Sequence, residues 1–270
     1  MNQPTTSGVA VSSPSPSILV EMREPGTVEI WLNRPERLNA LSVEMVTTLT
    51  KVVRGSVGSG VRALVLRGKG RGFCAGADLK ERKTMAQVER YAHNRAIYAA
   101  VEALAAVPVP TVAVINGAAM GGGLELTLAC DIRIAAENAQ LGLTEARIGA
   151  MPGGGGTQRL PRLIGLSRAL DLIYTGRTIS GREAANIGLV NTCVAEEGLD
   201  AAVTGYMDVL ASRSPTAARA VKKVVYEGLE LPIAEGLERE RKAFSAILRS
   251  ADYEEGLTAF AEKRPPRFSR

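Results

Sequence analysis

The sequence predicts an α/β layered domain followed by an all-helical region. Short apolar, strand-like runs alternate with helix-like segments over the first two thirds of the chain, which is typical of layered α/β domains. After about Leu199 the strand pattern stops, and the 270-residue length suits one large domain with an appended helical part. The predicted divisions are a tail at 1–17, an α/β core at 18–197 and a helical region at 198–270.

Hydrophobic periodicity and turn residues place the individual elements. A hairpin is predicted around Glu24-Pro25-Gly26, and Ser42 is expected to cap the first helix. Pro108 and Pro110 are expected to end the longest helix of the core. In chain order we expect strands at 17–22 and 27–33, a helix at 42–53, a strand at 61–66, a helix at 84–106, a strand at 111–115, a helix at 121–129, a strand at 131–135, and C-terminal helices at about 199–212, 215–229, 232–249 and 252–262.

The first 17 residues are rich in Ser, Thr and Pro and carry no charged side chain, which predicts a disordered tail. They lack the basic start and apolar block of a secretory signal and the arginines of a transit peptide. Cytoplasm is therefore the expected location. The longest apolar stretch, residues 107–120, is interrupted by prolines and is shorter than the roughly 18 residues of a membrane span, so no membrane-spanning helix is expected.

The composition limits the kinds of ligand and active site that the protein can have. The net charge of +5 favours an anionic ligand but is too weak and dispersed to indicate nucleic-acid binding. The three cysteines lie far apart and form neither a disulfide framework nor a CxxC pair, which points to a reducing compartment. A single histidine, His93, excludes a multi-histidine zinc site. We expect no metal, and carboxylates and backbone amides are expected to carry the chemistry.

Glycine runs at 121–123 and 153–156 mark places where backbone N–H groups can approach a ligand. Neither run fits a dinucleotide-binding or P-loop spacing. The first run follows a predicted strand and opens a helix, where free amides can stabilise an oxyanion. Glu125 follows in that helix and Glu145 lies further on, and two carboxylates there suit proton transfer next to a carbonyl. Taken alone, each glutamate also fits a solvated or helix-capping position.

Other conspicuous residues have structural interpretations. We interpret His93 as a structural or surface residue and Cys74 as a small core residue rather than a nucleophile. Asp78 is expected to cap a helix or hold a loop, and the glycine run at 153–156 to serve packing.

Several segments together resemble the crotonase (enoyl-CoA hydratase/isomerase) superfamily over nearly the whole chain, from about residue 18 to residue 268. The matching segments are NRPERLNALS (33–42), GFCAGADLKE (72–81), INGAAMGGGLELTLACDIRIA (115–135), LTEARIGAMPGGGGTQRLPRLIG (143–165) and TGRTISGREAANIGLVN (175–191). ADLKER together with AFAEKRPPRF is most similar to the hydratase branch that includes 3-methylglutaconyl-CoA hydratase. The resemblance implies a crotonase-like spiral of ββα units with a C-terminal helical region that forms trimers, or hexamers as pairs of trimers.

The resemblance also implies roles for particular residues. The oxyanion hole would be the backbone N–H groups of Ala77 and Gly122, and the two hydratase glutamates would be Glu125 and Glu145. Isomerases of the superfamily often lack the first glutamate, so the pair favours hydration. The resemblance also implies a set of residues that bind coenzyme A. This set is Arg37, Ala75, Ala77, Asp78, Leu79, Lys80, Phe260 and Lys263, of which Phe260 and Lys263 would come from a neighbouring subunit. Each basic residue of the set also fits a solvated surface charge.

The implied activity is that of a hydro-lyase, an enoyl-CoA hydratase that adds water reversibly across the 2,3 double bond of a 2-enoyl-CoA thioester. Coenzyme A is then part of the substrate, and no cofactor is expected. The acyl group stays open between 3-methylglutaconyl-CoA, in leucine breakdown, and a straight-chain enoyl-CoA, in fatty-acid oxidation. The alternatives are an acyl-CoA isomerase or decarboxylase, and an RNA-binding homologue. RNA binding is not expected, because the helix at 42–56 offers only Lys51 and Arg54 as basic residues.

Overall fold

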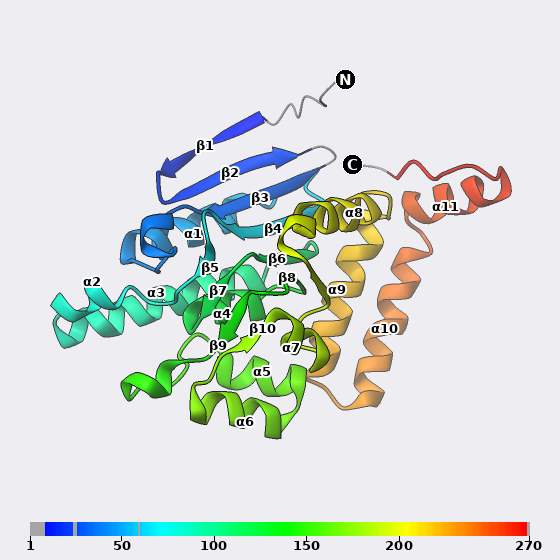
Figure 1. Ribbon diagram of the computed structural model, residues 1–270. Coiled ribbons are helices and arrows are strands. Elements are labelled where there is room, and N and C mark those ends of the chain that lie inside the picture. Colours follow the sequence, from blue (N-terminus) through cyan, green and yellow to red (C-terminus); the bar gives the residue numbers. More distant parts are fainter. Residues whose placement is uncertain (1–8, 24–25, 59, 269–270) are drawn as a thin grey trace.

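The computed structural model describes residues 9–23, 26–58 and 60–268 and shows two β-sheets enclosed by helices (Figure 1). In these residues the larger sheet has seven strands in the order β1-β2-β3-β4-β6-β8-β11, and the smaller has four in the order β10-β9-β7-β5. The larger sheet contains β1 (Val9–Ser15), β2 (Ile18–Arg23), β3 (Thr27–Leu32), β4 (Ala63–Gly68), β6 (Thr111–Ile115), β8 (Ile132–Ala136) and β11 (Thr192–Val194). The smaller contains β5 (Gly72–Cys74), β7 (Ala118–Met120), β9 (Gln140–Gly142) and β10 (Ile179–Ser180).

Helices follow or separate the strands and continue alone at the C-terminal end. The α-helices are α1 (Val43–Gly55), α2 (Leu79–Thr84), α3 (Gln87–Ala105), α4 (Gly122–Leu128), α5 (Gly156–Ile164), α6 (Leu166–Thr175), α7 (Gly181–Asn186), α8 (Leu199–Ala211), α9 (Pro215–Leu229), α10 (Ile233–Ile247) and α11 (Ala251–Ala261). Short 3-10 helices are η1 (Pro35–Arg37), η2 (Glu145–Ile148) and η3 (Glu196–Gly198). The mixed α/β architecture with C-terminal helices confirms the predicted fold class.

Alternating side chains bury both faces of the larger sheet. On β4, Leu64 and Leu66 join the main core, which includes side chains of α1, α3 and the smaller sheet. Ala63 and Val65 point the other way and pack with α8, through residues such as Val203. This two-sided burial explains why β4 is a continuous apolar run in the sequence.

Most of the predicted elements are confirmed within a few residues. The strand at 111–115 coincides with β6, and Ser42 caps α1 by accepting a hydrogen bond from the Met45 N–H at 3.2 Å. The hairpin is the antiparallel pair β2–β3, with its turn residues Glu24 and Pro25 outside the described residues. The helix predicted at 84–106 is wrong at its start, because Met85 has extended backbone angles that separate α2 from α3.

The disordered tail predicted for residues 1–17 is wrong for Val9–Ser15, which forms β1 antiparallel to β2. Without this strand, β2 would leave its outer row of backbone groups unpaired. The hydroxyl of Ser17 also donates to Glu44 on α1 at 3.0 Å, and that of Ser15 donates to the same carboxylate. Composition alone could not show that the edge of β2 is available to pair with this segment. Residues 1–8 of the predicted tail lie outside the described residues.

The four predicted C-terminal helices are present as α8 to α11, and the described residues after β11 contain no strand. A hydrogen-bond network attaches α9 to the residue before β8: Asp131 accepts from Lys222 Nζ at 2.7 Å and from the Tyr226 hydroxyl at 2.8 Å. Figure 1 shows α9 and α10 side by side along one edge of the molecule. Among the described residues, no helix combines the length and apolar character that crossing a membrane requires.

Candidate active site

Three neighbouring parallel strands of the smaller sheet end at the candidate site. β5 pairs with β7, and β7 with β9, all in parallel register. Ala77 follows the end of β5, Gly122 follows β7 and Glu145 follows β9. The carboxyl ends of parallel strands meet at one edge, which is where α/β proteins usually bind ligands. The sheet therefore brings together residues that lie up to 68 positions apart in the sequence (145 minus 77).

The amides of Ala77 and Gly122 lie in adjacent loops. The strand-like segment at Leu41 holds the first loop, because the Leu41 N–H donates to Gly76 O at 2.8 Å and the Asp78 N–H donates to Leu41 O at 3.0 Å. These bonds leave the intervening Ala77 N–H without an acceptor among the described residues. Gly122 is the first residue of α4, where N–H groups have no intrahelical partner.

Close packing explains the glycine that precedes Ala77. Gly76 has a φ of +85°, and a Cβ there would lie 2.7 Å from Met120 O and 3.3 Å from Gly122 N. A Cβ built on Gly122 would lie 3.9 Å from Ala77 N. The two free N–H groups are therefore close neighbours, and the arrangement can donate two hydrogen bonds to one oxyanion.

Glu125 is almost completely buried in α4, and other backbone amides hold its carboxylate. Oε1 accepts hydrogen bonds from the Gly154 N–H at 2.7 Å and from the Gly156 N–H at 2.8 Å. Burial raises the pKa of Glu125, while these two bonds and the charge of Arg159 oppose the shift. The sequence analysis assigned the glycine run at 153–156 to packing and did not predict this contact. A glycine run at the start of a helix could have indicated it, because free backbone N–H groups there commonly bind an anion.

Glu145 has a different environment, at the start of η2. Its Oε2 is buried without a hydrogen-bond partner in the described structure. Burial raises the pKa of Glu145 to about 7, and the charge of Glu125 contributes to the increase. A Cβ on Gly121 would lie 3.0 Å from Glu145 Oε1, which places this carboxyl group beside the start of α4. The pair thus combines one carboxylate with fixed hydrogen bonds and one carboxyl group that can exchange a proton near neutral pH.

Residues around the loop of Ala77 support it from several sides. His93 is buried in α3, and its Nε2 lies 2.8 Å from Leu41 O, so the single histidine is structural. Asp78 caps α2 by accepting from the Glu81 N–H at 3.2 Å and forms an ion pair with Arg34 at 3.1 Å. Burial raises the pKa of Cys74 to about 12, which makes this thiol a core residue rather than a nucleophile.

The residues predicted to bind coenzyme A fall into two groups. Arg37, Leu79 and Lys80 are exposed near the loop of Ala77, and the Ala75 N–H joins this loop to the η1 segment by donating to Leu38 O at 2.9 Å. The second group, Phe260 and Lys263, belongs to α11 and the residues after it, at the opposite end of the molecule from α2 (Figure 1). Within one chain these two do not reach the site, so their role stays a prediction for a neighbouring subunit.

Two further observations concern groups of possible metal ligands and the basic residues of α1. Within residues 9–23, 26–58 and 60–268, no group of three or more His, Cys, Asp or Glu side chains is arranged to hold a metal ion. Lys51 and Arg54 on α1 are exposed, but they are the only basic residues of that helix.

The fold and the site define an α/β enzyme of the crotonase superfamily. The family model described as Enoyl-CoA hydratase/isomerase matches residues 23–270. Human mitochondrial methylglutaconyl-CoA hydratase (Homo sapiens) is 41% identical and aligns over 92% of this chain and 75% of its own. Mouse enoyl-CoA hydratase domain-containing protein 2 (Mus musculus, mitochondrial) is 43% identical over 90% of this chain and 84% of its own.

Solved structures agree with the sequence comparisons. The crystal structure of an enoyl-CoA hydratase from Bacillus anthracis has a TM-score of 0.91 and 42% identity, and covers 93% of this chain and 98% of that protein. The chain belongs to the enoyl-CoA hydratase/isomerase family and is an enzyme of the hydratase type.

Proposed function

We propose that this protein catalyses the reversible addition of water across the 2,3 double bond of a 2-enoyl-CoA thioester. The observation that carries the proposal is the pair of glutamates, buried Glu125 and half-buried Glu145, beside the free amides of Ala77 and Gly122. Hydration requires one group to remove a proton from water and another to supply a proton to carbon. The pair offers both groups at one site.

In this mechanism the thioester carbonyl accepts hydrogen bonds from the N–H groups of Ala77 and Gly122. These donors stabilise the negative charge that develops on oxygen as water attacks C3, a contribution of about 3–4 kcal/mol for a preorganised donor. Glu125 takes a proton from the attacking water, and Glu145 gives its proton to C2. In dehydration each glutamate performs the reverse transfer, so protons and electrons balance in both directions.

The environments of the two carboxyl groups support these roles. The Gly154 and Gly156 amides fix Glu125 and favour its charged form against burial, as a base requires. Glu145 has a pKa of about 7, so a substantial fraction carries a proton at neutral pH. Its Oε2 has no partner within the described residues and is therefore free to interact with substrate.

The direct test follows the loss of the conjugated thioester absorbance with crotonyl-CoA, 3-methylcrotonyl-CoA and 3-methylglutaconyl-CoA. Glu125→Gln and Glu145→Gln should each lower kcat by at least about a hundredfold. An isomerase or decarboxylase would instead keep its activity without Glu125. If Glu125→Gln hydrates crotonyl-CoA as well as the wild type does, the two-glutamate mechanism is wrong.

For the acyl group, we favour a branched acidic substrate of the 3-methylglutaconyl-CoA kind, with a straight-chain enoyl-CoA as the second candidate. The similarity to human methylglutaconyl-CoA hydratase supports the first, and the similarity to enoyl-CoA hydratases supports the second. The same three substrates rank the two candidates, because only 3-methylglutaconyl-CoA carries a free carboxylate on its acyl chain.

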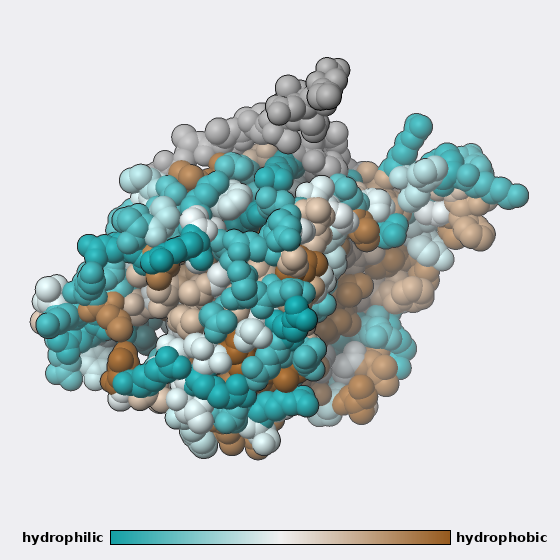
Figure 2. Space-filling view, viewed as in Figure 1, coloured by the Kyte–Doolittle hydropathy of each residue, from teal (hydrophilic) through white to brown (hydrophobic). Residues whose placement is uncertain are grey.

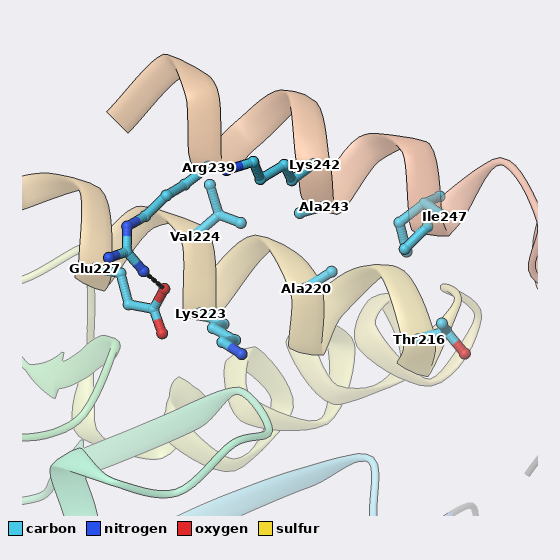
Figure 3. Close-up of a pocket in the computed structure, with 10 residues that line it drawn as sticks. Thr216, Ala220, Lys223, Val224, Glu227, Arg239, Lys242, Ala243 and Ile247 are labelled. Atoms are coloured by element: carbon cyan, nitrogen blue, oxygen red, sulfur yellow. Dashed lines mark hydrogen bonds and ion pairs between the residues drawn. The ribbon is translucent and has the colours of Figure 1, made fainter. Parts of the chain in front are cut away.

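We further propose that the enzyme works as a homotrimer, or as a hexamer built from trimers. A groove of about 420 Å³ lies between α9 and α10. Figure 3 shows Val224 and Ile247 among the side chains that line it, together with the Glu227–Arg239 ion pair that joins the two helices. Figure 2 shows hydrophobic surface along the same side. Exposed apolar residues of α9, α10 and α11 include Val221, Val225, Leu229, Ile233, Leu237, Phe244, Leu248, Leu257 and Phe260. Contact with a second copy of the chain would cover this surface.

A further inference from the structure

Arg159, in the first turn of α5, binds the glycine run at 153–156 through both its backbone and its side chain. Its backbone N–H donates to Gly155 O at 2.9 Å, and its Nη1 donates to Gly154 O at 3.2 Å. The N–H of the same Gly154 donates to Glu125 Oε1 at 2.7 Å. Arg159 therefore fixes one side of a residue whose other side holds the Glu125 carboxylate.

The guanidinium group occupies the space that a side chain at position 155 would need. Gly155 has a φ of +101°, and a Cβ built on it would overlap Arg159 Nη1. A residue with a side chain would be strained at this φ and would also push the guanidinium away from the loop. The glycine run therefore accommodates Arg159 on one side and the Glu125 carboxylate on the other.

Glu102, on α3, fixes the other end of the guanidinium group. Arg159 Nη2 donates to Glu102 Oε1 at 2.6 Å, which forms an ion pair between α5 and α3. α3 also lies beside the proposed oxyanion site, because a Cβ built on Gly122 would lie 3.6 Å from Ile97 Cγ2. The ion pair thus connects the loop that holds Glu125 to the helix that packs beside Gly122.

Arg159 also places positive charge near Glu125. α3, α5, β5 and β7 pack against α4, and η2 brings Glu145 close to it. The ionisable side chains of these four packed elements that are at least partly buried are His93, Glu102, Arg159 and Cys74. Burial lowers the pKa of His93 and raises that of Cys74 to about 12, so both are uncharged near pH 7. Arg159 is the one cation of this set, and its charge opposes the increase that burial causes in the pKa of Glu125.

We propose that Arg159 is a positioning residue for Glu125: it holds the 154–156 amides against the carboxylate and places a positive charge beside it. The inference rests on the proposed function, in which Glu125 takes a proton from water. A base must be ionised when the substrate binds, and a nearby cation favours the ionised carboxylate. In the described residues Arg159 bonds to the loop and to Glu102 rather than to Glu125, so it leaves Glu125 Oε2 available to the attacking water.

The test measures kcat/KM for the hydration of crotonyl-CoA between about pH 4.5 and 9. In the wild type the acid limb reports ionisation of Glu125, and the alkaline limb reports ionisation of Glu145. Arg159→Met should move the acid limb upward by about one pH unit, with a smaller change in the alkaline limb. Arg159→Lys keeps the charge and should restore the acid limb, although kcat stays below that of the wild type because an ammonium group cannot reproduce the forked contacts.

Arg162→Met is the matched control, because Arg162 is exposed on the same helix and donates to Gln158. It removes the same charge and should leave both limbs unchanged. Glu102→Gln removes a negative charge but keeps an oxygen acceptor for Arg159, so the acid limb should move to lower pH by about 0.3 unit.

An acid limb that stays in place in Arg159→Met, or that moves upward in Glu102→Gln, would overturn the proposal. Equal loss of kcat in Arg159→Met and Arg159→Lys with unchanged limbs would show that Arg159 only ties α5 to α3. Circular dichroism of each variant establishes that it is folded. If Arg159→Met does not fold, the direction of the shift in Glu102→Gln decides.

A measurement without substrate separates this inference from the proposed reaction. Difference infrared spectroscopy follows the carboxyl C=O stretching band as the pH is changed, and Glu125→Gln identifies the part of the band that belongs to Glu125. Arg159→Met should raise the midpoint of this titration, and Arg162→Met should not. If the midpoint rises but no enoyl-CoA is hydrated, the role of Arg159 stands and the proposed reaction fails. If crotonyl-CoA is hydrated but the midpoint does not move, the role of Arg159 is wrong.

Discussion

Glu125 and Glu145 are electrostatically coupled although they come from different secondary-structure elements. Burial, with a contribution from the charge of Glu125, raises the pKa of Glu145 to about 7. The backbone amides of Gly154 and Gly156 hold Glu125, whereas Glu145 Oε2 has no partner within the described chain. Two residues of one type thereby acquire different protonation behaviour, which is how carboxylate pairs divide acid and base roles.

The first prediction concerns the pH dependence of the two reaction directions. Hydration uses ionised Glu125 and protonated Glu145, and dehydration uses the same number of protons placed the other way round on the pair. Because the net reaction releases no proton, the ratio of the two kcat/KM values equals a pH-independent equilibrium constant, and the two profiles must run parallel. Both kcat/KM values should fall as the pH rises through about 7, where Glu145 loses its proton. Initial rates with crotonyl-CoA and with 3-hydroxybutyryl-CoA between pH 5.5 and 9 measure both directions. Values of kcat/KM that stay level between pH 7 and 9 would contradict the assignment.

The second prediction concerns stability. The folded pKa of Glu145 lies above its unfolded value of 4.5, so the folded state binds more protons between these values and loses stability as the pH rises toward 7. Glu145→Gln removes this penalty and should be more stable than the wild type by about 2 kcal/mol at pH 8. The difference should be near zero at pH 4.5. Urea unfolding at both pH values measures it, and an advantage at the lower pH alone would refute it.

A third prediction concerns the amides that hold Glu125. A Cβ added to Gly154 would lie 2.6 Å from Glu125 Oε2, so Gly154→Ala must displace the carboxylate. We expect kcat to fall by about a hundredfold, with a smaller change in KM, because misplacement of a reacting group affects the chemical step. Gly205→Ala in α8 is the matched control, since a Cβ there meets nothing within 4 Å. Equal activity of both variants would show that the contact is dispensable.

The fourth prediction tests His93. Replacing it with Leu removes the N–H donated to Leu41 O and should destabilise the protein by about 1–3 kcal/mol at pH 7.5. Burial lowers the pKa of His93, so the wild type itself loses stability as the pH falls below about 6.5, and the difference between the proteins should narrow at pH 5. Thermal unfolding at the two pH values measures this; a difference that widens in acid would argue against it.

The fifth prediction concerns assembly. Phe244 on α10 is 58% exposed, and a charge there would oppose burial of this surface against another copy. The wild type should have the mass of a trimer or hexamer by size-exclusion chromatography with light scattering, and Phe244→Glu should shift it to monomer. Tyr174→Glu, at an exposed residue of α6, should leave the mass unchanged. If the wild type is a monomer, the proposed trimer or hexamer is wrong, and Phe260 and Lys263 cannot contribute to the site of a neighbouring subunit.

Local sequence patterns predicted much of the fold. The strand at 111–115, the helix after Ser42 and the four C-terminal helices follow from periodicity and caps, because these patterns depend on residues a few positions apart. The short strands of the smaller sheet were missed as a set, since strands of two or three residues carry too little alternation to recognise. β1 was also missed, because an edge strand depends on a partner that composition does not reveal.

For the candidate site, the sequence by itself determined the residue types: two glutamates, two loops rich in glycine and a single histidine. Only the tertiary structure decided what each of them contacts. The parallel register of β5, β7 and β9 brings Ala77, Gly122 and Glu145 to one edge, and the burial that results sets the pKa of Glu145. Desolvation and hydrogen-bond partners are properties of packing between distant segments, and no local pattern encodes them.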